Sequence, residues 1–565
     1  MKSFRRESLL YLFAFIIALA VRLTKLGATP LTDAEARWAL QALGVAQGTH
    51  PASAANGSQP AYILLTSILF FAYGGGTNFL ARLIPALTGS ALVLVPYLFR
   101  ERLKPRPSLI LAFFLALDPG LVALSRQAGS PILALTFLFL AWGLWDHRHS
   151  RWAGVFAGMA LLSGSSLWEG LLGLGLTWLI RQGMEHGLKT ESAEHPTRSE
   201  WLNALWFGLG TIIVVGTLFF LAPNGLSAWL SSLPEYLRGW GRPSGVSSGM
   251  ILFSLAAYQP LAVILGLIAL ARGWIYRSRR AVRLSLWMLV ALLVALFYPA
   301  HQVSDLAWML IPLWSLAALE LARSLQVFPE ERREVLGVVA LCVLILVFMW
   351  LDFTSLLQTA GAADQAALRS WLLFGSFFLL VISILLVAVG WSISSAKLGA
   401  VWGLVAALGI YSFSAMTGAA GLRIFPTAEM WSPGSAVPQA NLLLTTVDQM
   451  SDWSDKNIDS QSVMIDGISS PALQWLLRGH PVDVADGLDA SASPPIVVTA
   501  NQNNPKLAAG YRGQSFVWRQ TPLWNQAQLI DWMNWLAYRR MPQNSETIIV
   551  WVRDDLFLDS ATPKP

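Results

Sequence analysis

Two carboxylates and a guanidinium, those of Asp33, Glu35 and Arg37, follow directly on a strongly apolar N-terminus in the stretch LTDAEARWAL, residues 31–40. A carboxylate here could serve as a general base, because a hydroxyl that attacks a carbon atom must lose its proton as the bond forms. The helix dipole also favours acids in a first helical turn, which is a structural explanation for the same residues. Asp33 and Glu35 do not share a helix face, although an Asp33 that caps the helix can point elsewhere.

Three arginines, Arg22, Arg82 and Arg126, stand at the ends of separate apolar segments, where basic residues are otherwise scarce. Arginine suits phosphate, because its planar guanidinium offers two parallel hydrogen bonds. We therefore predict that Arg82 and Arg126 converge on an anion. Arg22 is explained equally well as a long side chain that reaches from an apolar helix to the polar boundary.

Three further residues, Glu169, His301 and Asp305, are weaker candidates for substrate binding. An acid that begins an apolar segment, as Glu169 does, is costly and therefore a sign of function, although its boundary position is an alternative explanation. His301 and Asp305 either contact sugar or phosphate or cap the next helix. A divalent metal held by Asp33 and Glu35 is compatible with the pattern, but no metal-site or phosphate-loop motif requires one.

The composition indicates a membrane protein. Of the 565 residues, 55% are hydrophobic and 13% are charged, whereas soluble proteins carry about 25% charged residues. The net charge of +6 does not indicate nucleic acid, because Lys and Arg cluster in short loops between apolar runs. The one cysteine, Cys342, lies in such a run and excludes a disulfide within the chain.

The apolar runs predict a polytopic α-helical protein with about thirteen transmembrane helices. They lie near residues 8–26, 78–99, 108–124, 129–146, 152–166, 167–181, 201–222, 250–271, 284–299, 306–323, 334–351, 369–391 and 398–416. Basic loops at 99–106, 146–151, 181–198, 271–283 and 322–334 fall on the side of the N-terminus. The positive-inside rule makes that side cytoplasmic and places the C-terminus outside, in a multi-pass cell-membrane protein.

Two parts of the chain are predicted to lie outside the membrane. The first outer loop, 27–77, carries a helix over 33–47, with Thr32 or Asp33 as N-cap, and a second over 60–74 that is too short to span. Residues 1–416 form the transmembrane domain, and 417–565 form an extracytoplasmic α/β domain. Its strands are predicted at 462–467, 495–500, 515–520 and 547–552, and its helices at 439–453 and 525–540.

The motifs LTDAEARWALQAL, QPAYILL, GTNFLARLIPALTGSALVLVPYLFRERL and LDPGLVALSRQA resemble the GT-C superfamily of membrane glycosyltransferases. The nearest resemblance is to the family 39, protein-mannosyltransferase-like group, which includes the aminoarabinose transferases of lipid A. It covers about the first 150 residues. It implies that a sugar passes from a polyprenyl-phosphate lipid to a hydroxyl acceptor on lipid, glycan or protein outside the cytoplasm, with no cofactor required.

The sequence departs from the family at the base. If Glu35-Ala36-Arg37-Trp38 aligns with the family's Glu-x-Arg-aromatic motif, Ala34 takes the place of the aspartate base and Asp33 lies one residue earlier. Three outcomes stay open: Asp33 is the base, Glu35 is the base, or catalysis has been lost.

Two functions follow from these alternatives. The first is an inverting glycosyltransferase, in which Arg82, Arg126 and Arg37 bind the donor phosphate. The second is a non-catalytic GT-C-fold scaffold or assembly subunit that binds partners through its outer domain.

Overall fold

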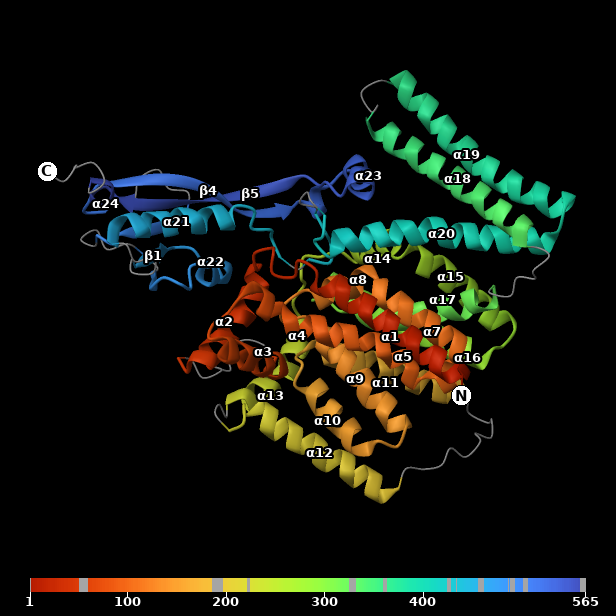
Figure 1. The fold of residues 1–565 in the computed structure, drawn as a ribbon, viewed down its shortest axis with the longest axis horizontal. Helices are drawn as coiled ribbons and strands as arrows, with labels where there is room; N and C mark the ends of the chain where they lie inside the picture. Colours follow the sequence, from red (N-terminus) through yellow and green to blue (C-terminus); the bar gives the residue numbers. More distant parts are fainter. Residues whose placement is uncertain are drawn as a thin grey trace.

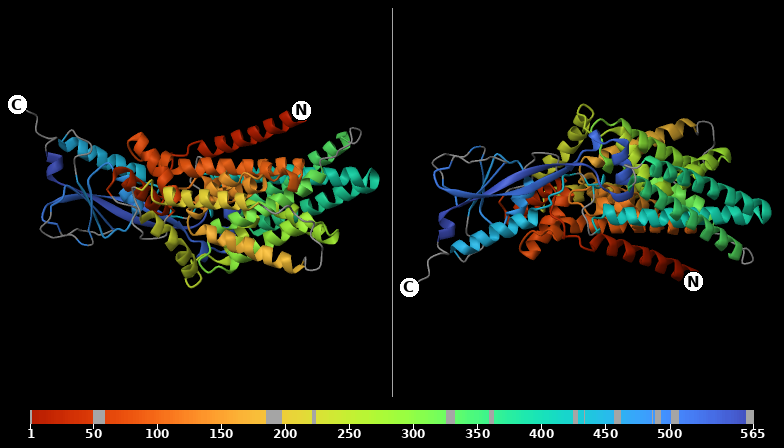
Figure 2. Two further views of the ribbon diagram at one scale, coloured as in Figure 1. Left: turned by 90° about the horizontal axis from the view of Figure 1, so that it is seen from below. Right: turned by 90° about the horizontal axis from the view of Figure 1, so that it is seen from above.

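The structure is a computed structural model that describes residues 2–49, 59–184, 197–220, 224–324, 332–358, 363–423, 428–432, 434–455, 462–485, 487, 493–500 and 507–558. A bundle of long helices makes up most of it, and a small sheet built from C-terminal residues projects from one end (Figures 1 and 2). The first helix starts at the other end of the bundle (Figure 2).

The helices of the bundle and its outer loop follow one another along the chain. They are α1 (Lys2–Leu23), α2 (Asp33–Gln47), α3 (Pro60–Tyr73), α4 (Asn78–Ala91), η1 (Leu92–Leu94), α5 (Val95–Leu98), α6 (Arg100–Leu103), α7 (Pro105–Leu117), α8 (Pro119–Ser125), α9 (Ile132–Asp146), α10 (Ser150–Leu161), α11 (Ser166–Met184), α12 (Arg198–Gly216), α13 (Asn224–Gly239), α14 (Ser248–Tyr258), α15 (Pro260–Ile275), α16 (Arg279–Phe297), η2 (Val303–Leu306), α17 (Ala307–Arg323), α18 (Arg332–Gln358), α19 (Ala363–Gly390) and α20 (Ile393–Ala419).

The predicted class, a polytopic helical membrane protein, is confirmed. Within the described residues, seven helices are long and apolar enough to cross a membrane, or up to ten if each of three bent pairs is one span. The predicted count of thirteen is not confirmed. Only 6% of the most apolar stretch of α19 is buried. Its exposed side chains are mostly apolar, as expected of a helix that faces lipid.

Two predicted spans are broken by proline. The span predicted at 250–271 is in fact α14 and α15, which meet at an angle of 96°, and the one at 108–124 is α7 and α8, which meet at 57°. The breaks fall at Pro260 and Pro119, because proline lacks an N–H and disfavours helical backbone in the residue before it. The amphipathic helix α13 is not predicted by the apolar runs, since its apolar residues cover only one face.

The C-terminal domain contains a five-stranded mixed sheet in the order β2-β1-β3-β5-β4. Its elements are α21 (Ala440–Asp455), β1 (Val463–Asp466), α22 (Pro471–Leu476), β2 (Val482–Ala485), β3 (Ile496–Ala500), β4 (Tyr511–Pro522), η4 (Trp524–Gln526), α23 (Leu529–Tyr538), β5 (Gln543–Arg553) and α24 (Asp555–Leu558). Strands β2, β1 and β3 are parallel, and β5 pairs antiparallel with both β3 and β4. The short strand β2 is not predicted; it is four residues long, and none of them is fully buried.

The sheet domain is docked on the first outer loop through the end of α22. The Trp475 ring packs against Phe70 of α3 with ring centroids 5.9 Å apart, and its indole N–H donates to Asn78 Oδ1 at 2.8 Å. Arg478 donates to the main-chain oxygen of Gly76 at 2.8 Å. A Cβ atom on Gly76 would lie 2.7 Å from the Trp475 ring, so this close approach requires glycine.

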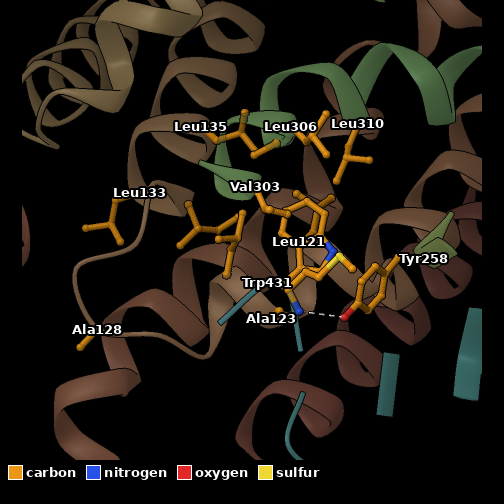
Figure 3. Packing of buried hydrophobic residues seen from close by; sticks show 14 of the residues in the cluster. Leu121, Ala123, Ala128, Leu133, Leu135, Tyr258, Val303, Leu306, Leu310 and Trp431 are labelled. Atoms are coloured by element: carbon orange, nitrogen blue, oxygen red, sulfur yellow. Dashed lines mark hydrogen bonds between the residues drawn. The ribbon is translucent and has the colours of Figure 1, made fainter. Parts of the chain in front are cut away.

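A second contact is made by the segment that joins α20 to the sheet domain. Trp431 is buried in the helical bundle, close to Leu121 and Tyr258 (Figure 3). The main-chain N–H of Met430 donates to the Tyr258 hydroxyl at 3.1 Å, and the Gln127 amide donates to the main-chain oxygen of Trp431 at 2.6 Å. The bundle and the sheet domain therefore share one continuous core.

Candidate functional site

Glu35 and Arg82 form a buried ion pair between α2 and α4. The guanidinium donates Nε to Oε1 at 2.7 Å and Nη2 to Oε2 at 2.8 Å, which is the bidentate geometry that arginine favours. The remaining Arg82 donors reach the main-chain oxygens of Leu26, Thr29 and Pro30 and the Thr29 hydroxyl. Each of the five N–H donors that a guanidinium carries therefore has an acceptor nearby.

The capping of α2 explains why Glu35 stands where it does. Thr32 is the N-cap, its hydroxyl accepts from the Glu35 N–H, and the Glu35 carboxylate accepts from the Thr32 N–H at 3.1 Å. The Ala128 N–H, from the turn after α8, donates to Oε1 at 3.1 Å. The sequence TDAE is the capping-box pattern, so this role could have been found from the sequence.

These contacts set the acidity of Glu35. Burial alone would raise the pKa of its carboxyl and is the largest single influence. The attraction of Arg82 and the hydrogen bonds from Arg82, Thr32 and Ala128 together outweigh burial, so the pKa lies below its ordinary value of 4.5. Glu35 is ionised at neutral pH.

The stability of the folded protein is therefore expected to depend on pH. A carboxyl whose pKa is lowered by folding stabilises the protein above its unfolded pKa and loses that contribution as the pH falls through the folded pKa. We therefore expect a melting temperature that is steady near neutral pH and declines below about pH 4.5. Thermal unfolding of the detergent-solubilised protein at a series of pH values would measure this. In Glu35→Gln the decline should be shallower, and an identical decline would contradict the assignment.

Asp33 is held by the sheet domain. Its Oδ1 accepts from the Ser470 hydroxyl at 2.6 Å and from the Ala472 N–H at 3.0 Å, and its Oδ2 accepts from Arg519 Nε at 2.8 Å and Nη2 at 2.7 Å. A carboxylate offers about four lone-pair positions, and all four are occupied here. The side chain is nevertheless 28% exposed. In this conformation Asp33 joins α2 to α22 and β4.

The other two arginines, Arg22 and Arg126, lie at the end of α1, where main-chain oxygens lack helical partners. Arg126 Nη1 donates to the oxygens of Val21, Arg22 and Thr24 at 2.8–3.0 Å. Arg22 is fully buried and donates to the Ser125 hydroxyl at 3.1 Å and to main-chain oxygens of α1 and α7. Such positions suit cations, because the C-terminal end of a helix carries partial negative charge.

Arg82 and Arg126 both donate to main-chain oxygens at the end of α1 and in the turn that follows it, and the anion on which they were predicted to converge is not tested. Arg37 differs from both, since it is exposed and makes no hydrogen bond with any residue that the structure describes. The roles of all three in binding phosphate stay predictions.

Glu169, Asp305 and His301 form a second group. Glu169, at the start of α11, is buried, and its carboxyl lies close enough to that of Asp305 in η2 for the two to interact. Asp305 also accepts from the Gln302 N–H at 2.8 Å, which is the capping role given above as an alternative. His301 Nε2 lies 2.8 Å from the Val246 oxygen.

A cavity of about 310 Å³ lies between the outer loop and the sheet domain. Leu31, Asn78, Trp475 and Arg478 belong to its lining, and its volume is in the range of small-ligand pockets. Asp33 and Glu35 are not among its lining residues. In the part of the chain that the structure describes, no group of three or more His, Cys, Asp or Glu side chains is arranged to hold a metal ion.

Comparison with known proteins bears on the fold. No protein-family model and no curated protein sequence matches the chain. Two crystal structures of ArnT from Cupriavidus metallidurans, one bound to undecaprenyl phosphate and one in the apo state, are similar. Each aligns with a TM-score of 0.54 and 14% identity, over 98% of this chain and 99% of the other. The GT-C fold that the motifs predicted is thereby confirmed, sheet domain included.

Proposed function

We propose that this chain is a membrane glycosyltransferase that takes a sugar from a polyprenyl-phosphate donor. It would transfer the sugar to a hydroxyl of a lipid, glycan or protein, with inversion at the anomeric carbon. The observation that carries the proposal is the match of 98% of the chain to ArnT, which was crystallised with undecaprenyl phosphate. Asp33, Glu35 and Arg82 belong to the motifs that resemble the family, and they lie at the end of the bundle that meets the sheet domain.

In this proposal Asp33 is the base that removes the proton from the acceptor hydroxyl. Its four acceptor positions are taken by Ser470, Ala472 and Arg519, so transfer proceeds from a state in which the contact with Arg519 has opened. Glu35 is less suited to this role, because it is buried and its oxygens are bonded to Arg82 and to two main-chain N–H groups.

The leaving phosphate needs positive charge, since negative charge grows on it as the sugar departs. Arg37 is exposed and has donors available to bind it. The donors of Arg82 are already used by Glu35 and the turn after α1, so Arg82 would contribute mainly its charge. One direct displacement from an activated phosphate donor needs no covalent enzyme intermediate, which leads to inversion.

The full chain in proteoliposomes, given synthetic polyprenyl-phosphate lipids that each carry a single sugar, tests the proposal. We expect one donor to be consumed in the presence of a hydroxyl acceptor, with release of free polyprenyl phosphate detected by mass spectrometry. The proposal is wrong if the protein binds these lipids but consumes no member of the panel with any acceptor offered.

A non-catalytic scaffold is the second candidate, and a specific observation favours it. Both acids of the opening motif are fully bonded, Glu35 within the bundle and Asp33 to the sheet domain. A chain that has lost catalysis could keep these contacts to hold the sheet domain in place for a partner protein. This candidate predicts lipid binding without turnover.

A further inference from the structure

The cavity of about 310 Å³ between the outer loop and the sheet domain lies beside the proposed base. Its walls come from both parts of the chain: the turn after α1 and the start of α4 on one side, and α21, α22 and β4 on the other. Ala472 belongs to its lining, and the main-chain N–H of Ala472 donates to Asp33 at 3.0 Å. Only the first turn of α22 therefore separates a ligand in this cavity from the Asp33 carboxylate.

Aromatic rings give the cavity apolar surface. Phe79, Trp475 and Trp518 line it. The indole N–H of Trp475 donates to Asn78 at 2.8 Å, and that of Trp518 donates to the Ser470 hydroxyl at 3.1 Å. Because both N–H groups are used within the protein, the two indole rings offer the cavity carbon atoms. Such rings pack well against the C–H bonds on one face of a sugar, since the face of an aromatic ring carries partial negative charge.

Three polar side chains, those of Asn78, Asn441 and Arg478, line the same cavity. The bond from Trp475 engages Oδ1 of Asn78, and no residue that the structure describes accepts from the NH2 group of this amide. The Asn441 amide likewise has no hydrogen-bond partner among the described residues. The Arg478 guanidinium is held in place by main-chain oxygens of Gly76 and Trp475. Amide and guanidinium N–H groups donate readily to hydroxyl oxygens.

The cavity is accessible at the end of the bundle that meets the sheet domain. Asn441 and Arg478 are exposed, and Phe79 is 40% exposed at the start of the span Asn78–Leu98. This end of the span lies on the side predicted to be extracytoplasmic. A glycan at the outer surface of the membrane can thus reach the cavity.

We propose that this cavity binds a sugar ring of the acceptor, so that the hydroxyl that receives the transferred sugar belongs to a glycan. The inference rests on the proposed glycosyltransferase function and names its acceptor. The volume is in the range of small-ligand pockets, and the walls match both the C–H face of a sugar and its hydroxyl rim. An acyl chain would leave the N–H groups of Asn78 and Asn441 without partners, which weakens binding. A peptide needs an acceptor for each main-chain N–H, whereas the NH2 group of Asn78 and the guanidinium of Arg478 only donate.

Saturation-transfer NMR of the full chain in lipid nanodiscs tests the binding without any donor lipid. Nanodiscs replace detergent, because detergents with sugar head groups would compete. The probes are the methyl glycosides of glucose, mannose, galactose and N-acetylglucosamine, with glycerol and a serine tripeptide as hydroxyl compounds that are not sugars. We expect at least one glycoside to bind more tightly than glycerol and the tripeptide.

Three variants on α21 locate the bound sugar. Leu444→Trp fills the cavity and should abolish binding, whereas Leu442→Trp makes the same change at a 52% exposed position outside the lining and should bind like the wild type. Asn441→Leu should weaken binding about two- to tenfold, through the loss of a hydrogen bond. Thermal unfolding of each variant checks that it is folded.

Equal losses in Leu444→Trp and Leu442→Trp would overturn the proposal, as would failure of every glycoside to bind or tighter binding of glycerol or the tripeptide. A transfer assay separates this inference from the proposed function. If the donor is consumed but Leu444→Trp leaves the KM for a glycan acceptor unchanged, the inference is wrong and the proposed function stands. If a glycoside binds in the cavity but no donor is consumed, the cavity is a sugar site and the proposed function is wrong.

Discussion

Replacing Asp33 with asparagine is expected to lower sugar transfer by about 10²–10⁴-fold, which is the usual contribution of a general base. Asparagine has nearly the same shape and can still accept from Ser470 and Ala472 through its oxygen. It cannot take a proton from an acceptor hydroxyl. Transfer from the polyprenyl-phosphate donor in proteoliposomes would measure the loss, at a protein concentration matched by the amount of folded chain.

Arg519→Gln is the matched control, because it removes the same ion pair from the other side and leaves the carboxylate in place. The pair is partly exposed, so its loss should cost at most about 1 kcal/mol of stability. We expect Arg519→Gln to transfer sugar at least as fast as the wild type, since its Asp33 no longer needs to be released. Equal losses in the two variants would show that Asp33 only holds the sheet domain in place, and wild-type activity in Asp33→Asn would exclude it as the base.

Arg82→Gln is expected to destabilise the fold by about 3–5 kcal/mol, the usual cost of removing one partner from a buried ion pair. Glu35 would be left buried with its charge uncompensated, and the oxygens of Leu26, Thr29 and Pro30 would lose donors. The melting temperature of the solubilised protein, or the yield of folded chain where it falls too far, would report the effect.

The comparison variant is Arg148→Gln, which removes the more exposed pair between Arg148 and Glu200. Exposed pairs contribute about 0–1 kcal/mol. Adding Glu35→Gln to Arg82→Gln should recover part of the loss, because the stranded charge disappears with its partner. If Arg82→Gln were as stable as Arg148→Gln, the ion pair would not be the element that fixes α2 on α4.

Local patterns in the sequence predict the helices well, because their causes are local. The helix over 33–47 was predicted with its exact bounds, since Thr32 and Glu35 cap it and its apolar residues recur at helical spacing. The breaks at Pro119 and Pro260 follow from the same kind of local rule, but hydropathy does not reveal them, because the residues on both sides of each break are apolar.

The partners of the site residues could not be predicted, because they are distant in sequence. Asp33 and Arg519 are 486 positions apart, and neither neighbourhood contains a signal for the other. The sequence predicts that the arginines face an anion, whereas Arg126 and several donors of Arg82 are bonded to main-chain oxygens. Every residue has a main-chain oxygen, so no sequence motif can indicate such a partner. The Glu169–Asp305 pair likewise depends on how α11 and η2 meet.

The link between Asp33 and Arg519 also has a consequence for the order of biosynthesis. At about 5–20 residues per second, a ribosome takes roughly half a minute to a minute and a half to add the 486 residues between them. During that interval α2 already exists while β4 and α22 do not. Phe70 and the rest of the loop surface that packs against Trp475 stay exposed until translation is nearly complete. A chain truncated before α22 would contain all the residues of the first loop, but that loop would lack the contacts that the sheet domain makes with Asp33 and Phe70.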